Sequence, residues 1–300
     1  MNPRTISGAR GETRCYANNE GGEGTPILVL HGGPGFGSDP ALTEVLGLKS
    51  PMYFYDQYGC GGSNSMKDPS EYTVDAFMDQ IDEVRAEYSL DSVILMGMCW
   101  GAGLATSYAS RKGARGVKAM ILSSPFLSLD LWERDQRANL ASMPEPERSA
   151  LQRYEAEENY SMGYRKALIP YFQRFYFTRG DASLISQLVM GRQPEVYRRM
   201  WGESELFCKG ALSGFDAMRG AGGIDCPVLL IGGDRDVVSA ETMEAYRDGF
   251  RDAQLAIVPN SGHMIYNEQL SIVKAIVKSF VREIDNRPKK NLPSSMRSSL

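Results

Sequence analysis

The sequence predicts an α/β protein built on a mostly parallel, doubly wound sheet, with a helical insertion near its middle. Short buried-strand signals alternate with loops and helix-compatible segments on both sides of residues 127–215. Within 127–215 the strand signals vanish, while charged residues follow closely on one another and aromatic residues cluster. Three hundred residues with 42% hydrophobic content are enough to bury a core of this kind.

Short runs of large apolar and β-branched side chains mark the strands. We expect an edge strand at 13–17 and buried strands at 27–30, 52–55, 93–96, 117–125, 228–231 and 255–259. Helical spacing of apolar residues marks 71–88, and further helices are expected after residue 100, at 241–250 and at 268–284. Residues 1–126 and 216–300 would then form the α/β core, 127–215 a helical cap, and the basic, Pro/Ser-rich 286–300 a disordered tail.

Composition argues against several classes of protein. A net charge of −4 leaves no basic surface for nucleic acid, and no stretch approaches the roughly 20 apolar residues of a membrane span. The N-terminus lacks the apolar region of a signal peptide, so a cytoplasmic location is expected. Five cysteines at irregular spacings, with no CxxC pair, suggest neither a disulfide framework nor a metal site. The sequence does not fix the oligomeric state.

The rest of the chain is organised around residues 92–103, SVILMGMCWGAG. A buried strand there runs into G-x-C-x-G, formed by Gly97, Cys99 and Gly101, and then into a helix-compatible segment. This is the setting of the nucleophile elbow, normally G-x-S-x-G, in which glycines leave room for a strained turn that lifts the central side chain above the sheet. Cys99 is therefore the candidate nucleophile.

Nucleophilic acyl transfer also needs a base and an acid that orients it, and in this setting the chain order is nucleophile, acid, histidine. The sequence supplies Asp236 or Asp234 after a core strand and His263 in the loop after the last strand. We favour Asp236, because the acid usually lies a few residues beyond the strand end, whereas Asp234 can serve the turn through its side chain. The catalytic candidates are thus Cys99, Asp236 and His263.

Two backbone N–H groups are candidates for an oxyanion hole. Trp100 follows the nucleophile and opens a helix whose N-terminal dipole favours negative charge. The second donor should come from the glycine-rich turn at 31–35, and there we choose Gly33. His31, in the same turn, is expected to brace the turn rather than to move protons.

The motifs HGGPG, DQYGCGGS, GMCWGAG, GGDRD and SGHM occur in this order over nearly the whole chain. On these motifs the chain resembles the α/β-hydrolase fold and, within it, the prolyl aminopeptidase (proline iminopeptidase) family. The resemblance implies release of an N-terminal residue, often proline, from a small peptide, an amino-acid amide or an ester, without metal or organic cofactor. It also implies that acidic cap residues bind the substrate's free α-amino group.

In the stretch MWGESELF (200–207), which resembles the family's cap segment, Glu205 takes the amine-binding position, and Glu203 and Trp201 are further substrate-binding candidates. Three positions depart from the family's pattern. Val237 stands where some members have a glutamate, Gly62 where arginine is usual, and Cys99 where the family has serine.

Cysteine at the nucleophile position leaves three explanations open. The chain is a natural cysteine variant, carries a laboratory serine-to-cysteine change, or has lost catalysis and become a binding protein. A helix N-terminus and a paired histidine stabilise thiolates, which would react readily with esters and thioesters. With unactivated amides the thiolate is also the better leaving group, so an esterase, thioesterase or acyltransferase is the alternative to an aminopeptidase.

Overall fold

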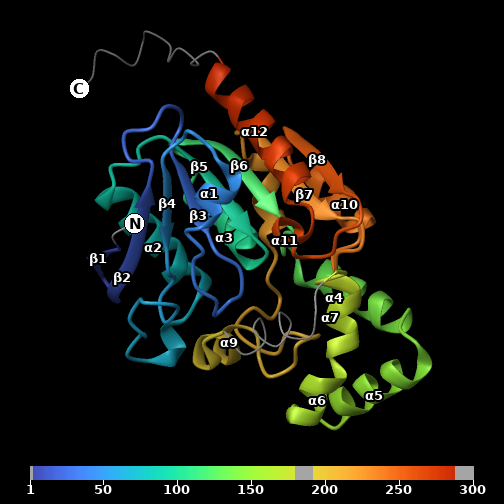
Figure 1. The fold of residues 1–300 in the computed structure, drawn as a ribbon. Coiled ribbons are helices and arrows are strands. Elements are labelled where there is room, and N and C mark those ends of the chain that lie inside the picture. Colours follow the sequence, from blue (N-terminus) through green and yellow to red (C-terminus); the bar gives the residue numbers. More distant parts are fainter. Residues whose placement is uncertain (1–2, 180–191, 288–300) are drawn as a thin grey trace.

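Eight strands of the computed structural model, which describes residues 3–179 and 192–287, form one sheet in the order β1-β2-β4-β3-β5-β6-β7-β8 (Figure 1). β2 pairs antiparallel with β1 and β4, whereas the pairs from β4 to β8 are parallel. The strands are β1 (Arg4–Gly8), β2 (Gly11–Asn18), β3 (Ile27–Leu30), β4 (Met52–Tyr55), β5 (Val93–Met98), β6 (Val117–Ser123), β7 (Val228–Gly233) and β8 (Ala253–Val258).

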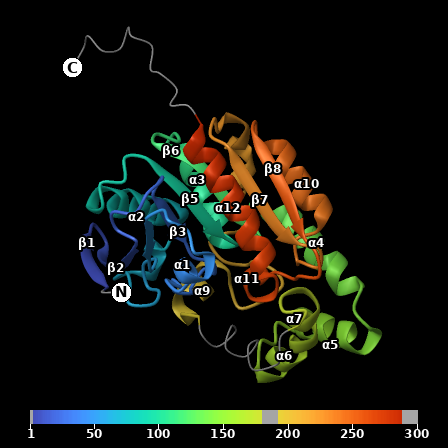
Figure 2. The ribbon, with the colours of Figure 1, turned by 45° about the horizontal axis from the view of Figure 1, so that its top comes forward.

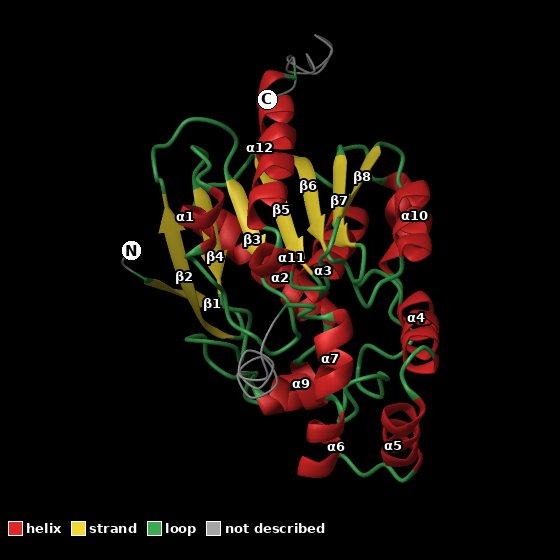
Figure 3. Cartoon of the chain, turned by 45° about the vertical axis from the view of Figure 1, so that its right-hand side comes forward, coloured by secondary structure: helices red, strands yellow, loops and turns green. Residues whose placement is uncertain are grey.

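Helices cover both faces of the sheet, as Figures 2 and 3 show. In β3, whose residues are all buried, Leu28 and Leu30 join the core under α2, α3 and α10, while Ile27 and Val29 join the core under α1 and α12. Alternate side chains of a strand point to opposite faces, so a continuous apolar run fits a sheet covered on both sides. The core helices are α1 (Leu42–Leu46), α2 (Val74–Glu87), α3 (Trp100–Arg111), α10 (Ala240–Gly249), α11 (Ile265–Glu268) and α12 (Leu270–Asn286), with 3-10 turns η1 (Pro69–Glu71) and η2 (Ala217–Gly223).

A helical segment is inserted between β6 and β7 and lies beyond the carboxyl ends of the parallel strands (Figure 3). The chain enters and leaves it side by side, because Ser128 and Asp216 form an isolated antiparallel bridge. These contacts support our division into a core and a cap at 127–215, which we keep as a proposal. Its described helices are α4 (Leu129–Ala141), α5 (Glu145–Ala156), α6 (Met162–Ala167), α7 (Ile169–Phe175) and α9 (Pro194–Met200).

The predicted fold class is confirmed, and the edge of the sheet is corrected. The strand expected at 13–17 is β2, which is not an edge strand, because β1 lies outside it. β1 gave little signal, since only Ile6 of its five residues is buried. Most of the expected tail lies outside the described residues, and α12 continues to Asn286. No described helix combines the length and apolar character needed to cross a bilayer.

Candidate active site

Cys99 lies at a strained turn between β5 and α3. Its backbone has φ 49° and ψ −114°, a conformation that residues other than glycine rarely adopt. The flanking glycines are required by space, because a Cβ on Gly97 would lie 2.4 Å from the carbonyl oxygen of Gly101. A Cβ on Gly101 would lie 2.2 Å from the carbonyl oxygen of Leu30. The G-x-C-x-G segment therefore has the packing of a nucleophile elbow, with the Cys99 thiol partly exposed at the cavity.

The structure brings His263 and Asp236 together beneath the cap. His263 Nδ1 lies 2.7 Å from Asp236 Oδ1, and both side chains are almost fully buried. Asp236 Oδ1 also accepts a hydrogen bond from the Val238 N–H at 3.2 Å, while its Oδ2 has no partner in the described part of the chain. Asp234 instead accepts a hydrogen bond from the Ser261 N–H, so of the two aspartates Asp236 is the one that contacts the imidazole.

The charges around His263 favour its protonated form. Burial alone disfavours the imidazolium, but the negative charges of Asp236 and of a Cys99 thiolate, together with hydrogen bonds to both, raise the pKa of His263 to about 10. A protonated imidazole beside a thiolate is, in general, an arrangement in which the sulfur can attack a carbonyl and the imidazole can supply a proton.

Both candidate oxyanion donors adjoin Cys99. Trp100 is the first residue of α3, and Gly33 has φ 127°, a backbone conformation that favours glycine. A Cβ built on the neighbouring Gly32 would lie 3.5 Å from the Cβ of Cys99, so the turn runs directly alongside the thiol. Neither the Trp100 nor the Gly33 N–H donates to an acceptor among the described residues. Both N–H groups are thus free to bind an anion.

Buried hydrogen bonds tie the glycine-rich turn to the elbow. The Gln57 side chain donates to the His31 carbonyl oxygen at 3.0 Å and accepts from the Trp100 indole N–H at 2.9 Å. His31 Nε2 accepts from the Gln57 N–H, so its Nδ1–H donates to the Gly32 carbonyl oxygen. Burial lowers the pKa of His31, which fits a neutral, structural imidazole. His31 therefore lies where a bracing role requires it.

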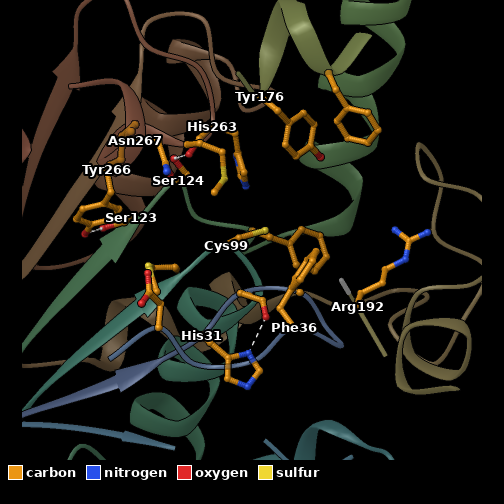
Figure 4. Close-up of a pocket in the computed structure, with 18 of the residues that line it drawn as sticks. His31, Phe36, Cys99, Ser123, Ser124, Tyr176, Arg192, His263, Tyr266 and Asn267 are labelled. Atoms are coloured by element: carbon orange, nitrogen blue, oxygen red, sulfur yellow. Dashed lines mark hydrogen bonds between the residues drawn. The ribbon is translucent and has the colours of Figure 1, made fainter. Parts of the chain in front are cut away.

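Cys99 and His263 open into one cavity of about 300 Å³, a size that suits a small ligand (Figure 4). Trp201 lies in its wall, where its ring packs against Phe126 and Trp132. The walls of the cavity are mostly apolar, and core and cap both contribute residues to them. They include Gly33, Phe36, Met98, Phe126, Trp132, Phe172, Tyr176, Arg192, Tyr197, Trp201 and Glu205.

The two candidate glutamates lie in different surroundings. Glu205 lines the cavity, and its carboxylate pairs with both terminal nitrogens of Arg192, one of them at 2.6 Å. Glu203 pairs with Arg198, and both side chains are more than half exposed. Glu203 does not line the cavity that contains Cys99, so of the two only Glu205 is placed to contact a ligand there.

Comparisons with known proteins place the chain in a family. The model of the alpha/beta hydrolase fold family matches residues 25–269. A proline iminopeptidase of Heyndrickxia coagulans is 34% identical over 274 residues, covering 89% of this chain and 93% of its own. The chain belongs to the proline iminopeptidase family of the α/β-hydrolase fold. A proline iminopeptidase of Lactobacillus delbrueckii subsp. lactis is 27% identical, covering 86% of this chain and 90% of its own.

Solved structures show the same fold. The crystal structure of a Mycobacterium smegmatis proline iminopeptidase superposes with a TM-score of 0.84 at 24% identity, covering 95% of this chain and 99% of that one. VinJ superposes with a TM-score of 0.86 at 22% identity, covering 94% and 99%. As a member of this family the chain is a hydrolytic enzyme.

Several residues at this family member's site were not predicted. Tyr176, at the end of α7, packs against the His263 ring with centroids 4.9 Å apart, and the Trp132 ring packs edge-on against the same imidazole with centroids 6.0 Å apart. Arg192 pairs with Glu205 from a loop with no sequence signal for that contact. The aromatic clustering in the cap indicated cavity-lining residues in general, but not which ones. No group of three or more His, Cys, Asp or Glu side chains is placed to hold a metal ion within 3–179 and 192–287.

Proposed function

We propose that this enzyme is a proline iminopeptidase-like hydrolase, which releases an N-terminal residue from small peptides, amides or esters through an acyl-enzyme on Cys99. The observation that carries the proposal is one cavity lined by both Cys99, at a strained elbow, and His263, whose Nδ1 lies 2.7 Å from the buried Asp236 carboxylate. The names of the relatives support the substrate class.

In the proposed first step, the Cys99 thiolate attacks the substrate carbonyl carbon, and the negative charge that develops on the oxygen binds the N–H groups of Gly33 and Trp100. The tetrahedral intermediate then collapses, a proton passes from His263 to the leaving nitrogen or oxygen, and a thioester remains on Cys99. Asp236 holds the imidazole in orientation and stabilises its positive charge. Because a thiolate leaves more easily than an amine, this proton transfer decides whether an amide is cleaved.

In the second step, His263 takes a proton from water, and the hydroxide attacks the thioester and restores the Cys99 thiolate. Acylation helps His263 change from acid to base. The thiolate charge is one cause of the raised His263 pKa, and an uncharged thioester no longer supplies it. The imidazole therefore releases its proton more readily in the acyl-enzyme than in the free enzyme.

Intact-mass measurement after mixing with an activated proline or alanine ester tests this proposal. We expect a mass increase equal to the acyl group on the wild-type chain, none on Cys99→Ala, and an ester adduct on Cys99→Ser. An adduct that persists in Cys99→Ala would assign the nucleophile to another residue and overturn the mechanism.

An esterase, thioesterase or acyltransferase is the second candidate, favoured by the sulfur nucleophile itself. It predicts faster cleavage of esters than of matched arylamides and, for an acyltransferase, formation of a new amide when an amine is added. Comparison of proline and alanine esters with the corresponding arylamides separates it from the aminopeptidase.

A further inference from the structure

Glu205 is already neutralised by a cation of its own chain. Arg192 contacts both carboxylate oxygens, and the side chains are only 11% and 7% exposed. The Arg192 guanidinium also lies over the Tyr197 ring, 3.7 Å from its centroid, and the Tyr197 hydroxyl donates to Glu205 at 3.0 Å. Although burial disfavours its charge, Tyr197 and Glu205 raise the pKa of Arg192, so the guanidinium stays charged.

This pair changes how the cavity receives a positively charged substrate group. A carboxylate offers about four acceptor positions, and Arg192 and Tyr197 occupy three of those on Glu205. A substrate ammonium could reach the remaining one, but it would then lie beside the Arg192 guanidinium. Attraction by one charge and repulsion by another at similar distance largely cancel. The part of the cavity lined by Glu205 and Arg192 therefore distinguishes poorly between a charged amine and a neutral group of the same size.

We propose that Arg192 is a specificity-determining residue that makes this enzyme accept acyl groups with or without a free α-ammonium. The inference rests on the proposed function, since it concerns the acyl group transferred to Cys99. The remaining walls agree with it, because the ring contacts of Phe126, Trp132 and Trp201 make an apolar surface that suits an uncharged acyl group.

Two esters with the same leaving group test the proposal on the full chain. Alanyl and isobutyryl p-nitrophenyl esters have nearly the same shape, and a methyl group in the second replaces the ammonium of the first. At pH 6.5, where the α-amino group is charged, we expect their kcat/KM values to agree within tenfold for the wild type, after each is divided by the rate constant of the same ester with a free thiol, because the electron-withdrawing ammonium activates the alanyl carbonyl by itself. Arg192→Met should raise the alanyl-to-isobutyryl ratio at least tenfold, since it leaves Glu205 free to attract the ammonium.

Glu205→Gln is the second variant, and it leaves the Arg192 charge uncompensated. It should lower the same ratio below that of the wild type, and it keeps the test decisive if Arg192→Met does not fold. Arg111→Met is the matched control, because Arg111, the last residue of α3, pairs with Asp75 where both side chains are more than half exposed. The control should leave the ratio unchanged.

A wild-type ratio above tenfold in favour of the alanyl ester, or a ratio that Arg192→Met leaves unchanged, would overturn the role of Arg192. Intact-mass measurement separates this failure from that of the proposed function. An acyl adduct on Cys99 with an unaltered ratio refutes only the role of Arg192, whereas no adduct with either ester refutes both proposals.

Discussion

Replacing Asp236 by asparagine should lower the pKa of His263 by about 3 units. The carboxylate oxygen lies 2.7 Å from His263 Nδ1, which puts the two charge centres about 4 Å apart. At an effective dielectric constant near 20, this attraction amounts to about 4 kcal/mol, and each pKa unit corresponds to about 1.4 kcal/mol. Because the lost charge favoured the imidazolium, the pKa should fall from about 10 toward about 7.

Proton NMR of the imidazole C2–H signals can measure this change, because the chain has only two histidines. His31 serves as an internal reference, since it is buried and hydrogen-bonded to Gly32 and Gln57 rather than to Asp236. The same variant should lose kcat/KM by about a thousandfold, because the asparagine side chain no longer stabilises the charge on His263 or fixes its tautomer.

Asp234→Asn is the matched control, since Asp234 lies in the same turn but bonds to the Ser261 N–H rather than to the imidazole. It should change the His263 pKa by less than half a unit and kcat/KM by less than about fivefold. The reasoning fails if the His263 pKa in Asp236→Asn stays within one unit of the wild type. It also fails if the control shifts that pKa as far.

Three further outcomes follow from the same geometry. In urea unfolding, Cys99→Gly should be more stable than Cys99→Ala by about 1 kcal/mol, because glycine relieves the backbone strain at φ 49° while both variants lack the thiol. Equal urea midpoints for the two variants would show that the turn is unstrained. Glu268→Gln should lower kcat about tenfold, leave KM nearly unchanged and alter the pH profile. Gly262, next to His263, Thr178 and Arg179 all donate hydrogen bonds to the Glu268 carboxylate, and the glutamine amide would face one of these donors with its own N–H. Glu283→Gln is the control, and a loss of stability without a change in kcat would contradict the prediction. The stability contributed by His263 should be complete below pH 6.5 and fall as pH rises toward 10, because only the folded state keeps the His263 proton in that range. In Asp236→Asn, the free energy of unfolding should depend less on pH between pH 6.5 and 10.

Local patterns were sufficient for most of the core. The run at 27–30 is apolar throughout because β3 is buried on both faces, and the apolar spacing in 71–88 predicted α2, whose Thr73 accepts the Ala76 N–H as an N-cap. β1 was missed because its sequence, RTISG, contains a single large apolar residue, Ile6, whereas β8, the strand at the other edge, was predicted from the apolar run at 255–259.

At the site, sequence motifs located the groups attached to strand ends but not the contacts made by the cap. Cys99, Asp236 and His263 each follow a core strand, so the topology brings them to one edge of the sheet. The pairing of Arg192 with Glu205 depends on how the loops of the cap fold back, and no periodicity encodes such a contact. An amine-binding role for Glu205 was expected from the resemblance, whereas its pairing with Arg192 had no signal in the sequence.

The helical segment between β6 and β7 also holds the loop of His263, the proposed base. The His263 N–H donates to the Phe175 carbonyl oxygen at 2.8 Å, and the Met264 N–H donates to that of Tyr176 at 3.1 Å. A Cβ on Gly262 would lie 2.6 Å from the same Phe175 oxygen, which leaves no room for a side chain between α7 and this loop. Any movement of α7 therefore moves the backbone of His263. Cap substitutions that shift α7 should consequently change kcat as well as KM, whereas in a cap that only bound substrate they would change KM alone.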